Sequence, residues 1–198
     1  MRKLKLQSQI SVDGFIGGPN GEMDWITWNL TPDILKSITE LNSGIDLILL
    51  GKNLATGFIP HWKAEATDPA KKRDFVEKMS AEEDFAVKLY KTPKVVFSKS
   101  VDHADWDFTR IEKGDLTEAV NKLKNQDGGD IIVYGGASFV SSLIKAGLID
   151  ELNLYVNPVA IGNGMPIFRE LTNKQNFILK KAEQFECGIA LLRYELQN

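Results

Sequence analysis

The sequence predicts a three-layer α/β fold, with a mostly parallel central sheet of about eight strands and a C-terminal antiparallel hairpin. Short apolar runs alternate with helix-compatible segments along most of the chain, as in parallel sheets covered on both faces. Near the C-terminus, two apolar runs flank a tight turn, which is typical of a hairpin. The 198 residues, 43% of them apolar, suffice for a single domain spanning residues 1–198.

The first elements follow from periodicity and from helix-start residues. Residues 4–12 alternate loosely between apolar and polar side chains, which predicts the first strand. Thr31 can cap a helix, Pro32 suits the first helical position, and Asp33 is an acid in the first turn. The helix that they begin leads into a buried strand at residues 45–50.

The middle of the chain has weaker signals. We expect residues 60–69 to form a loop, and residues 70–90 to be mostly helical and strongly charged, either as a solvated helix or as a mobile flap. Residues 94–97 read as a short strand, and residues 106–111 as another.

The last third returns to clear patterns. Asp115 resembles the cap of a helix that runs to about Asn125. A strand at residues 130–134 and a helix at residues 138–146 follow. The remaining expected strands are one around residues 152–156 and the hairpin of residues 177–185 and 189–196.

Composition excludes several classes of function. The net charge is −3 and no long basic run occurs, so we expect no nucleic-acid partner. Neither a signal peptide nor an apolar stretch of about 20 residues is present, so we expect no membrane partner. The single Cys187 suits a reducing compartment, and a cytoplasmic protein is the expectation. Two distant histidines and one cysteine do not make a metal site.

The most informative segment is residues 130–139, where an apolar run ends at Gly135 and Gly136 and a helix begins. Glycines allow a sharp bend and close approach of a ligand, and the first N–H groups of a helix attract phosphate. We therefore assign Gly135, Gly136, Ala137 and Ser138 to a nucleotide-phosphate site. The alternative is a strand-to-helix turn that binds nothing.

Two other expected strand ends carry residues suited to anions. Gly51 and Lys52 follow one strand, and Ser98, Lys99 and Ser100 follow another. In a parallel sheet these ends line one crevice, where a molecule with several phosphates could bind. Lys52 would face one phosphate, and residues 98–100 another, such as a ribose 2′-phosphate. The alternative is that both lysines are solvated loop residues.

Five motifs in order resemble the dihydrofolate reductase-like superfamily, specifically the RibD C-terminal family of riboflavin-biosynthesis reductases and its stand-alone relatives. They are Ser11-Val-Asp13-Gly14-Phe-Ile, Leu49-Leu-Gly51-Lys52, Lys94-Val-Val-Phe-Ser98-Lys99, Val133-Tyr-Gly135-Gly136 and residues 158–168. The resemblance covers nearly the whole chain. It implies a dihydrofolate reductase-like fold and NADPH bound at the strand ends, with Gly135 and Gly136 against the pyrophosphate and with Ser11, Asp13 and Gly14 in the cofactor site.

A second resemblance concerns residues 28–33, which are similar to the Trp-Asn-Leu-x-x-Asp segment of bacterial dihydrofolate reductases. Carried over, it makes Asp33 the catalytic residue that holds the substrate ring and assists its protonation. Burial would raise the pKa of Asp33 toward a useful range. The alternative is an acid that only stabilises a helix start. Trp28 would bind substrate and shield the nicotinamide, or simply fill the core.

Together these features predict an NADPH-dependent reductase of a pyrimidine- or pterin-type heterocycle, a small-molecule substrate. The closest match is 5-amino-6-(5-phosphoribosylamino)uracil reduction, as in riboflavin biosynthesis. Dihydrofolate reduction is one alternative, and a non-catalytic NADP(H)-binding protein is another. The resemblance also implies a homodimer.

Overall fold

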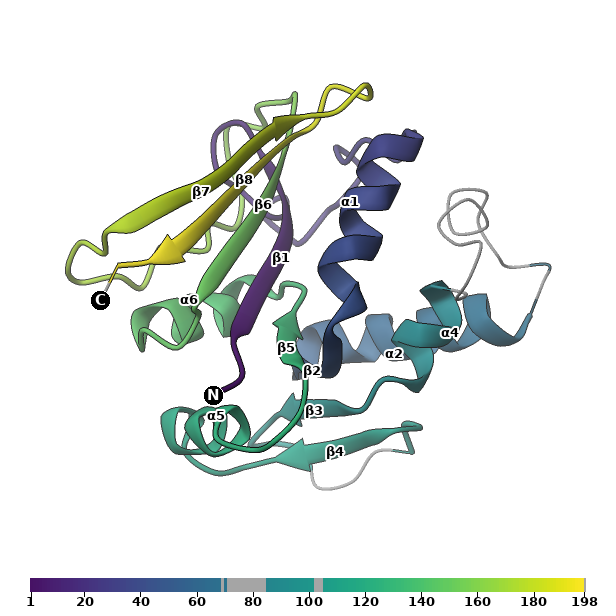
Figure 1. The fold of residues 1–198 in the computed structure, drawn as a ribbon, viewed down its shortest axis with the longest axis vertical. Coiled ribbons are helices and arrows are strands. Elements are labelled where there is room, and N and C mark those ends of the chain that lie inside the picture. The colour runs from purple at the N-terminus through teal and green to yellow at the C-terminus, as the bar shows by residue number, and fades with distance from the viewer. Residues whose placement is uncertain (69, 71–84, 102–104, 198) are drawn as a thin grey trace.

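The computed structural model describes residues 1–68, 70, 85–101 and 105–197. Its centre is an eight-stranded sheet in the order β4-β3-β2-β5-β1-β6-β8-β7 (Figure 1). The strands from β4 to β6 in this order pair in parallel, and β8 and β7 add two antiparallel pairings at the edge. This confirms the predicted mostly parallel sheet with a C-terminal hairpin.

The element bounds agree closely with the expected ones outside the middle of the chain. The strands are β1 (Leu4–Ser11), β2 (Ile45–Gly51), β3 (Lys94–Phe97), β4 (Thr109–Glu112), β5 (Asp130–Val133), β6 (Glu151–Asn157), β7 (Phe177–Gln184) and β8 (Ala190–Leu196). The helices are α1 (Pro32–Ser43), α2 (Lys52–Thr67), α4 (Phe85–Lys91), α5 (Leu116–Lys124) and α6 (Ala137–Lys145).

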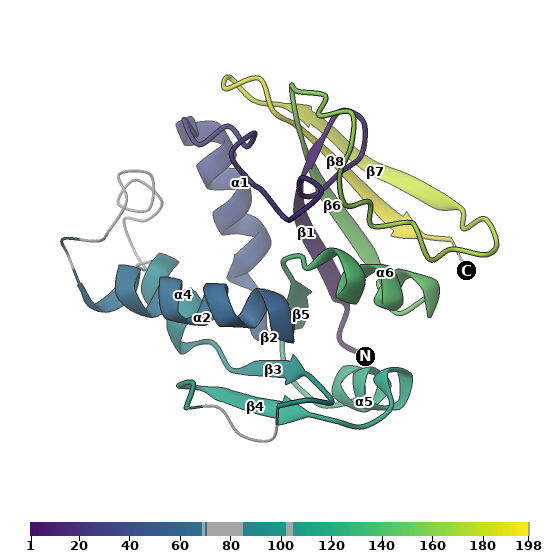
Figure 2. The same ribbon diagram turned by 180° about the vertical axis from the view of Figure 1, so that it is seen from behind.

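Alternation along the strands divides the core between the two faces of the sheet. On β2, Ile48 and Leu50 pack with α1, α2 and α4, whereas Leu47 and Leu49 pack with α5 and α6. Figure 2 shows α5 and α6 from behind. Successive side chains of a strand point to opposite faces, so an apolar run of this kind fills two cores at once. The predicted three layers are therefore present.

Local signals explain where the helices begin. α1 starts at Pro32 after an extended Thr31, as predicted. Asp115 caps α5, because its carboxylate accepts hydrogen bonds from the N–H groups of Thr117 at 2.9 Å and Glu118 at 3.0 Å.

The loop predicted for residues 60–69 is wrong, because α2 runs through Pro60 to Thr67. Pro60 lies on the exposed side of the helix, where water can satisfy the carbonyl that loses its hydrogen bond. Most of the charged segment predicted at residues 70–90 lies outside the described residues, and its last part forms α4. In the described ranges, no helix is long and apolar enough to cross a membrane.

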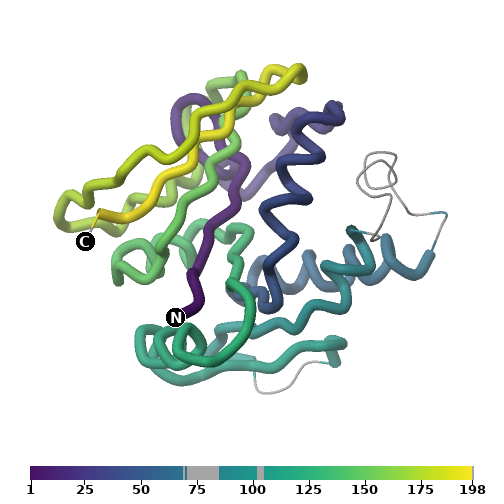
Figure 3. The backbone as a smooth tube through the Cα atoms, in the orientation of Figure 1, coloured from purple at the N-terminus to yellow at the C-terminus, as the bar shows by residue number. Residues whose placement is uncertain are grey.

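The path of the chain, traced in Figure 3, creates a point where connections diverge. From β2 the chain moves outward to β3 and β4, then returns to β5 between β2 and β1, and crosses β1 to reach β6. In open α/β sheets, ligands bind outside the carboxyl ends of the strands at such a point.

Candidate functional site

A polar cleft of about 520 Å³ lies where the carboxyl ends of β2, β3 and β5 meet. Its lining joins residues that are far apart in the sequence: Asn20, Gly21, Gly51, Lys52, Asn53, Leu54, Phe97, Gly136, Ala137, Ser138, Phe139 and Met165. Two of the three predicted strand ends thus contribute to one cleft. We call it the polar cleft.

Two helices begin at the polar cleft. Lys52 is the first residue of α2 and Ala137 is the first of α6, and their cap residues, Gly51 and Gly136, have no side chain that could bond the first N–H groups. Each helix start leaves several N–H donors without an intrahelical partner and carries a partial positive charge. Two such starts facing one cleft suit a ligand with adjacent phosphates.

The glycines are required by the backbone at this turn. Gly136 has φ +83° and Gly135 has φ +149°, a conformation that favours glycine. A Cβ on Gly135 would have no neighbour within 4 Å, so this backbone is open to a ligand. A Cβ on Gly51 would lie 2.8 Å from Cβ of Phe139, so Gly51 lets the starts of α2 and α6 approach each other.

The third predicted strand end lies beside the first. Nζ of Lys52 donates to Oγ of Ser100 at 2.9 Å. Ser98 accepts from the N–H groups of Ser100 at 3.3 Å and Val101 at 3.1 Å, so its hydroxyl shapes the turn. The backbone of residues 98–101 is therefore held against the start of α2.

Lys99 lines a second, smaller cavity of about 280 Å³, which we call the lysine pocket. Phe97 and Phe139 line both this pocket and the polar cleft, so the two are neighbours. The lysine pocket also contains Lys113, together with Glu112 and Asp115, whose carboxylates hold the turn and the cap of α5.

A third cavity, of about 240 Å³, lies between β1, α1, α2 and α4, and we call it the apolar cavity. It is lined by Gln7, Gln9, Met23, Trp28, Leu30, Ile38, Leu54, Phe58, His61, Trp62, Phe85, Leu89 and Tyr134. Leu54 lines both this cavity and the polar cleft. The burial of Tyr134 raises the pKa of its hydroxyl well above the usual range, so the phenol stays protonated.

Trp28 and Asp33 have different positions. Trp28 lines the apolar cavity and is about half exposed. Asp33 is absent from the described lining; its carboxylate accepts from the Thr31 hydroxyl at 2.5 Å, Ile34 N–H at 2.9 Å and Glu186 N–H at 2.9 Å. The expectation of a raised pKa is wrong, because these bonds, the Thr31 hydroxyl foremost, lower the pKa of Asp33. Its role as proton donor stays a prediction.

Ser11 ends β1, Asp13 and Gly14 lie in the turn that follows, and none of the three belongs to the described cavity linings. The Ser11 hydroxyl donates to Asp13 at 2.6 Å, and the Asp13 carboxylate accepts from Gly162 N–H at 2.7 Å and Ile161 N–H at 3.2 Å. These bonds hold the loop after β6 against β1. The predicted contact of these three residues with the cofactor stays a prediction.

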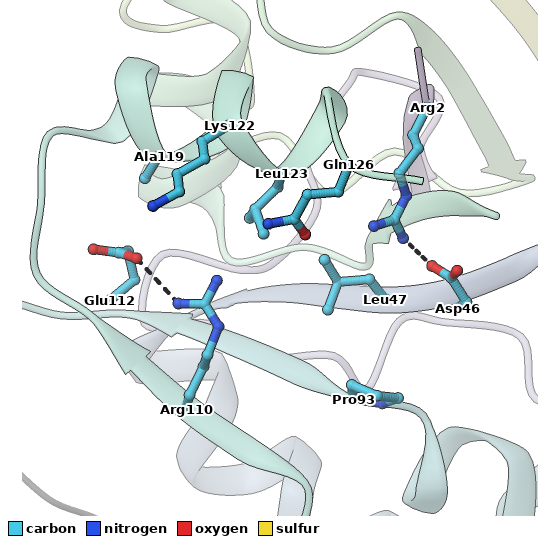
Figure 4. A pocket seen from close by; sticks show the side chains of 10 residues that line it. All are labelled: Arg2, Asp46, Leu47, Pro93, Arg110, Glu112, Ala119, Lys122, Leu123 and Gln126. Atoms are coloured by element: carbon cyan, nitrogen blue, oxygen red, sulfur yellow. Dashed lines mark hydrogen bonds and ion pairs between the residues drawn. The ribbon is translucent and has the colours of Figure 1, made fainter. Parts of the chain in front are cut away.

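A fourth cavity, of about 460 Å³, lies beside α5 and the amino ends of β1, β2 and β3 (Figure 4). Four of the five charged side chains in its described lining form pairs, because Arg2 bonds Asp46 and Arg110 lies 3.1 Å from Glu112; the fifth is Lys122. Most of its lining lies at the other end of the strands from the polar cleft, and Glu112, at the carboxyl end of β4, lines both this cavity and the lysine pocket.

Apart from Trp28, the residues that line the apolar cavity were not predicted from the sequence. Leu54, Phe58 and Trp62 recur every four residues along α2, a helical pattern that Pro60 conceals. A second signal was Gln7 with Gln9: a central strand of a covered parallel sheet is normally apolar on both faces, and here one face is polar.

Comparison with known proteins gives consistent results. Residues 2–191 match the family model of the RibD C-terminal domain. The uncharacterized protein YyaP of Bacillus subtilis is 32% identical over 98% of this chain and 94% of that protein. A putative riboflavin biosynthesis protein from Shewanella, 20% identical, superposes with a TM-score of 0.68 over the whole of both chains.

A longer structure shares the same fold. The Thermotoga maritima diaminohydroxyphosphoribosylaminopyrimidine deaminase/5-amino-6-(5-phosphoribosylamino)uracil reductase is 18% identical, with a TM-score of 0.67. The match covers 99% of this chain and 57% of that one.

Proposed function

This chain belongs to the RibD C-terminal domain family, and we propose that it is an NADPH-dependent reductase of a pyrimidine- or pterin-type heterocycle. The supporting observation is that the polar cleft and the apolar cavity adjoin at Leu54. The first suits the phosphates of a dinucleotide, and the second suits an aromatic ring. NADPH, when bound, supplies the hydride.

The residues of the polar cleft fit such a cofactor. The N–H groups at the starts of α2 and α6 would hold the pyrophosphate, with the open backbone of Gly135 and Gly136 beside it. Lys52 would add a point charge, held within reach by Ser100. Lys99 in the lysine pocket would bind the 2′-phosphate that distinguishes NADPH from NADH.

The chain's own contribution is to position the substrate ring and to keep water away from it. The aromatic walls of the apolar cavity would orient the substrate ring and exclude water. Among the named candidates, the ring reduced by the Thermotoga relative carries a ribosylamino phosphate, and dihydrofolate carries a pterin. The alternative is a non-catalytic NADP(H)-binding protein, which would have the same polar cleft but would not reduce a substrate.

The test is to titrate NADPH and NADH by fluorescence into the unaltered protein and into Lys99→Ala. We expect NADPH to bind more tightly, and Lys99→Ala to lose about 1.5–3 kcal/mol of NADPH binding through one charge-assisted contact. NADH binding should change little.

Two further variants sharpen the measurement. Gly136→Val should abolish binding, because a branched residue at φ +83° disfavours the backbone of the cleft. Lys145→Ala, at the other end of α6, is the matched control and should bind normally. Equal affinities for the two cofactors in the unaltered protein would overturn the NADPH assignment. Cofactor binding without oxidation in the presence of any pterin or pyrimidine would favour the non-catalytic alternative.

A further inference from the structure

The floor of the apolar cavity carries two glutamines whose amide orientation is fixed by their neighbours. Gln7 and Gln9 are two residues apart on β1, so their side chains lie on the same face of the sheet, both half-buried. Each meets one buried asparagine that is not part of the described lining. These are Asn42 of α1, which is 1% exposed, and Asn157 of β6, which is fully buried.

The Asn42 amide sets the orientation of Gln7. Nδ2 of Asn42 donates to the carbonyl of Ile38 at 2.8 Å, and a carbonyl can only accept. Oδ1 of Asn42 accepts from the Tyr134 hydroxyl. The second hydrogen on Nδ2 therefore goes to Oε1 of Gln7, at 3.0 Å. Gln7 thus turns its oxygen toward Asn42 and leaves its NH₂ group for another acceptor.

The Asn157 amide sets the orientation of Gln9 in the same way. The N–H of Thr27 donates to Oδ1 of Asn157 at 3.0 Å, and a backbone N–H can only donate. Nδ2 of Asn157 accordingly donates to Oε1 of Gln9 at 2.8 Å. Across the described part of the chain, neither glutamine NH₂ group has an acceptor. Neither nitrogen is buried from solvent, so both are accessible at the cavity.

The walls of the cavity indicate a flat ring without charge. Phe58 stacks with Tyr134, their ring centroids 5.3 Å apart, and Trp62 meets Phe85 edge to face at 5.6 Å. The described lining contains no lysine, arginine, aspartate or glutamate. The one described lining residue that can become a cation is His61, and its Nε2 already lies 3.5 Å from the buried carboxylate of Glu65. A phosphate or carboxylate placed here would therefore lose its hydration and meet an imidazole that is already paired with an acid. The volume of about 240 Å³ is also below that of most drug-sized ligand sites, roughly 300–1,000 Å³.

We propose that the apolar cavity selects an uncharged, flat aromatic heterocycle whose edge presents two acceptors, carbonyl oxygens or ring nitrogens, to the amides of Gln7 and Gln9. The proposal rests on the proposed function for the role of this ring as the reduced substrate. It adds that the ring is read by hydrogen-bond donors of the protein, whereas a ring rich in amino groups would require a carboxylate. It also adds that a phosphate is not held by the described lining.

The experiment compares two rings of one shape by isothermal titration calorimetry at pH 7. Quinazoline-2,4-dione presents two carbonyl oxygens, and 2,4-diaminoquinazoline presents two amino groups and readily takes up a proton. We expect the dione to bind at least about tenfold more tightly to the unaltered, NADPH-loaded protein. A dione that carries a carboxylate on its benzo ring should bind more weakly than the parent dione.

Isosteric variants then exchange donors for acceptors. Gln7→Glu and Gln9→Glu keep an oxygen for Asn42 and Asn157, and each should shift the preference toward the diamine. Gln184→Glu, the same change on exposed β7, is the matched control and should leave both affinities unchanged. Circular dichroism checks that each variant is folded, and the comparison on the unaltered protein needs no variant.

These experiments distinguish a failure of the ring-binding proposal from a failure of the proposed function. If NADPH does not bind, the proposed function fails, and the same ring titrations on the cofactor-free protein still decide about the cavity. A diamine that binds as tightly as the dione, a carboxylated dione that binds as tightly as its parent, or folded glutamate variants with an unchanged preference would each overturn the proposal.

Discussion

The two faces of the sheet differ most clearly along β1. Toward α5 and α6, this strand presents Leu4 and Leu6, both fully buried, in a closed apolar core. Toward α1 it presents Gln7 and Gln9, which line a cavity. Both faces are covered by helices, and the two glutamines are half-buried beneath this cover rather than on an open surface of the sheet. The difference indicates that one face stabilises the fold, whereas the other gives up apolar contact to hold a ligand.

When one side chain on each face of β1 is replaced, the largest expected effect is on stability. Leu6→Ala should lower the free energy of unfolding by about 2–5 kcal/mol, because it removes a fully buried side chain and leaves a cavity. Gln7→Glu, one residue away on the other face, should change stability by no more than about 1 kcal/mol, since it keeps an acceptor oxygen for Nδ2 of the buried Asn42. Urea denaturation measures both, and similar losses for the two variants would contradict the division between the faces.

A second prediction concerns the start of α1 on the open face. Asp33→Asn should leave NADPH affinity and turnover nearly unchanged, because the carboxylate bonds to Thr31, Ile34 and Glu186 and lies outside the described lining of the apolar cavity. The expected change is a small loss of stability that disappears at acid pH. The pKa of Asp33 is lowered in the folded protein, so its contribution is present above pH 3.8 and fades below it.

Steady-state kinetics with dihydrofolate and with the aminopyrimidine intermediate provides the check. A fall in turnover of about 10²-fold, with loss of one ionisation from the pH profile, would instead give Asp33 the role of proton donor.

The smallest expected effect is on the pH dependence of stability. It distinguishes two buried lysines that lie on opposite faces of the sheet. Lys124, beside the closed core, pairs with Asp150 at 2.7 Å. Lys94 on the open face donates to the carbonyls of Tyr90 at 2.7 Å and Thr92 at 2.6 Å, and burial lowers its pKa from 10.5 to about 8. Between these values the unfolded chain binds more protons, so stability should rise with pH from about 8 to 10.5.

Thermal unfolding across this pH range measures the trend. Lys94→Met should remove the rise, and the same change at Lys91, an exposed lysine of α4, should retain it. An unaltered slope in Lys94→Met would assign the pH dependence to other groups.

Much of the fold could be predicted because its signals are local. The apolar run of β2 and the Thr31-Pro32 helix start each act over a few residues, and both were placed correctly. α2 was not predicted: residues 60–69 were expected to be a loop, and whether a helix tolerates Pro60 depends on which of its sides meets solvent.

The candidate site could be predicted at its glycines and not at its ring-binding surface. Gly51 ends β2, Lys52 and Gly136 follow strands, and parallel strand ends meet at one edge whatever the packing. The role of Gln7 depends on Asn42, 35 residues later, and on α1 covering that face of β1. Alternation along β1 shows that one of its faces is polar, whereas the helix that covers this face, and so the partners of the glutamines, are set by tertiary packing.

The contact between Gly51 and Phe139 has a consequence for how this family can vary. Because a Cβ at position 51 would meet the Cβ of Phe139, near the main chain of α6, rotating the aromatic ring cannot relieve the overlap. The spacing of the two helix starts is therefore set by the missing side chain at position 51. Homologues with a larger residue there should carry a compensating change at position 139 or a displaced α6. Covariation between these two positions would then record the width of the polar cleft.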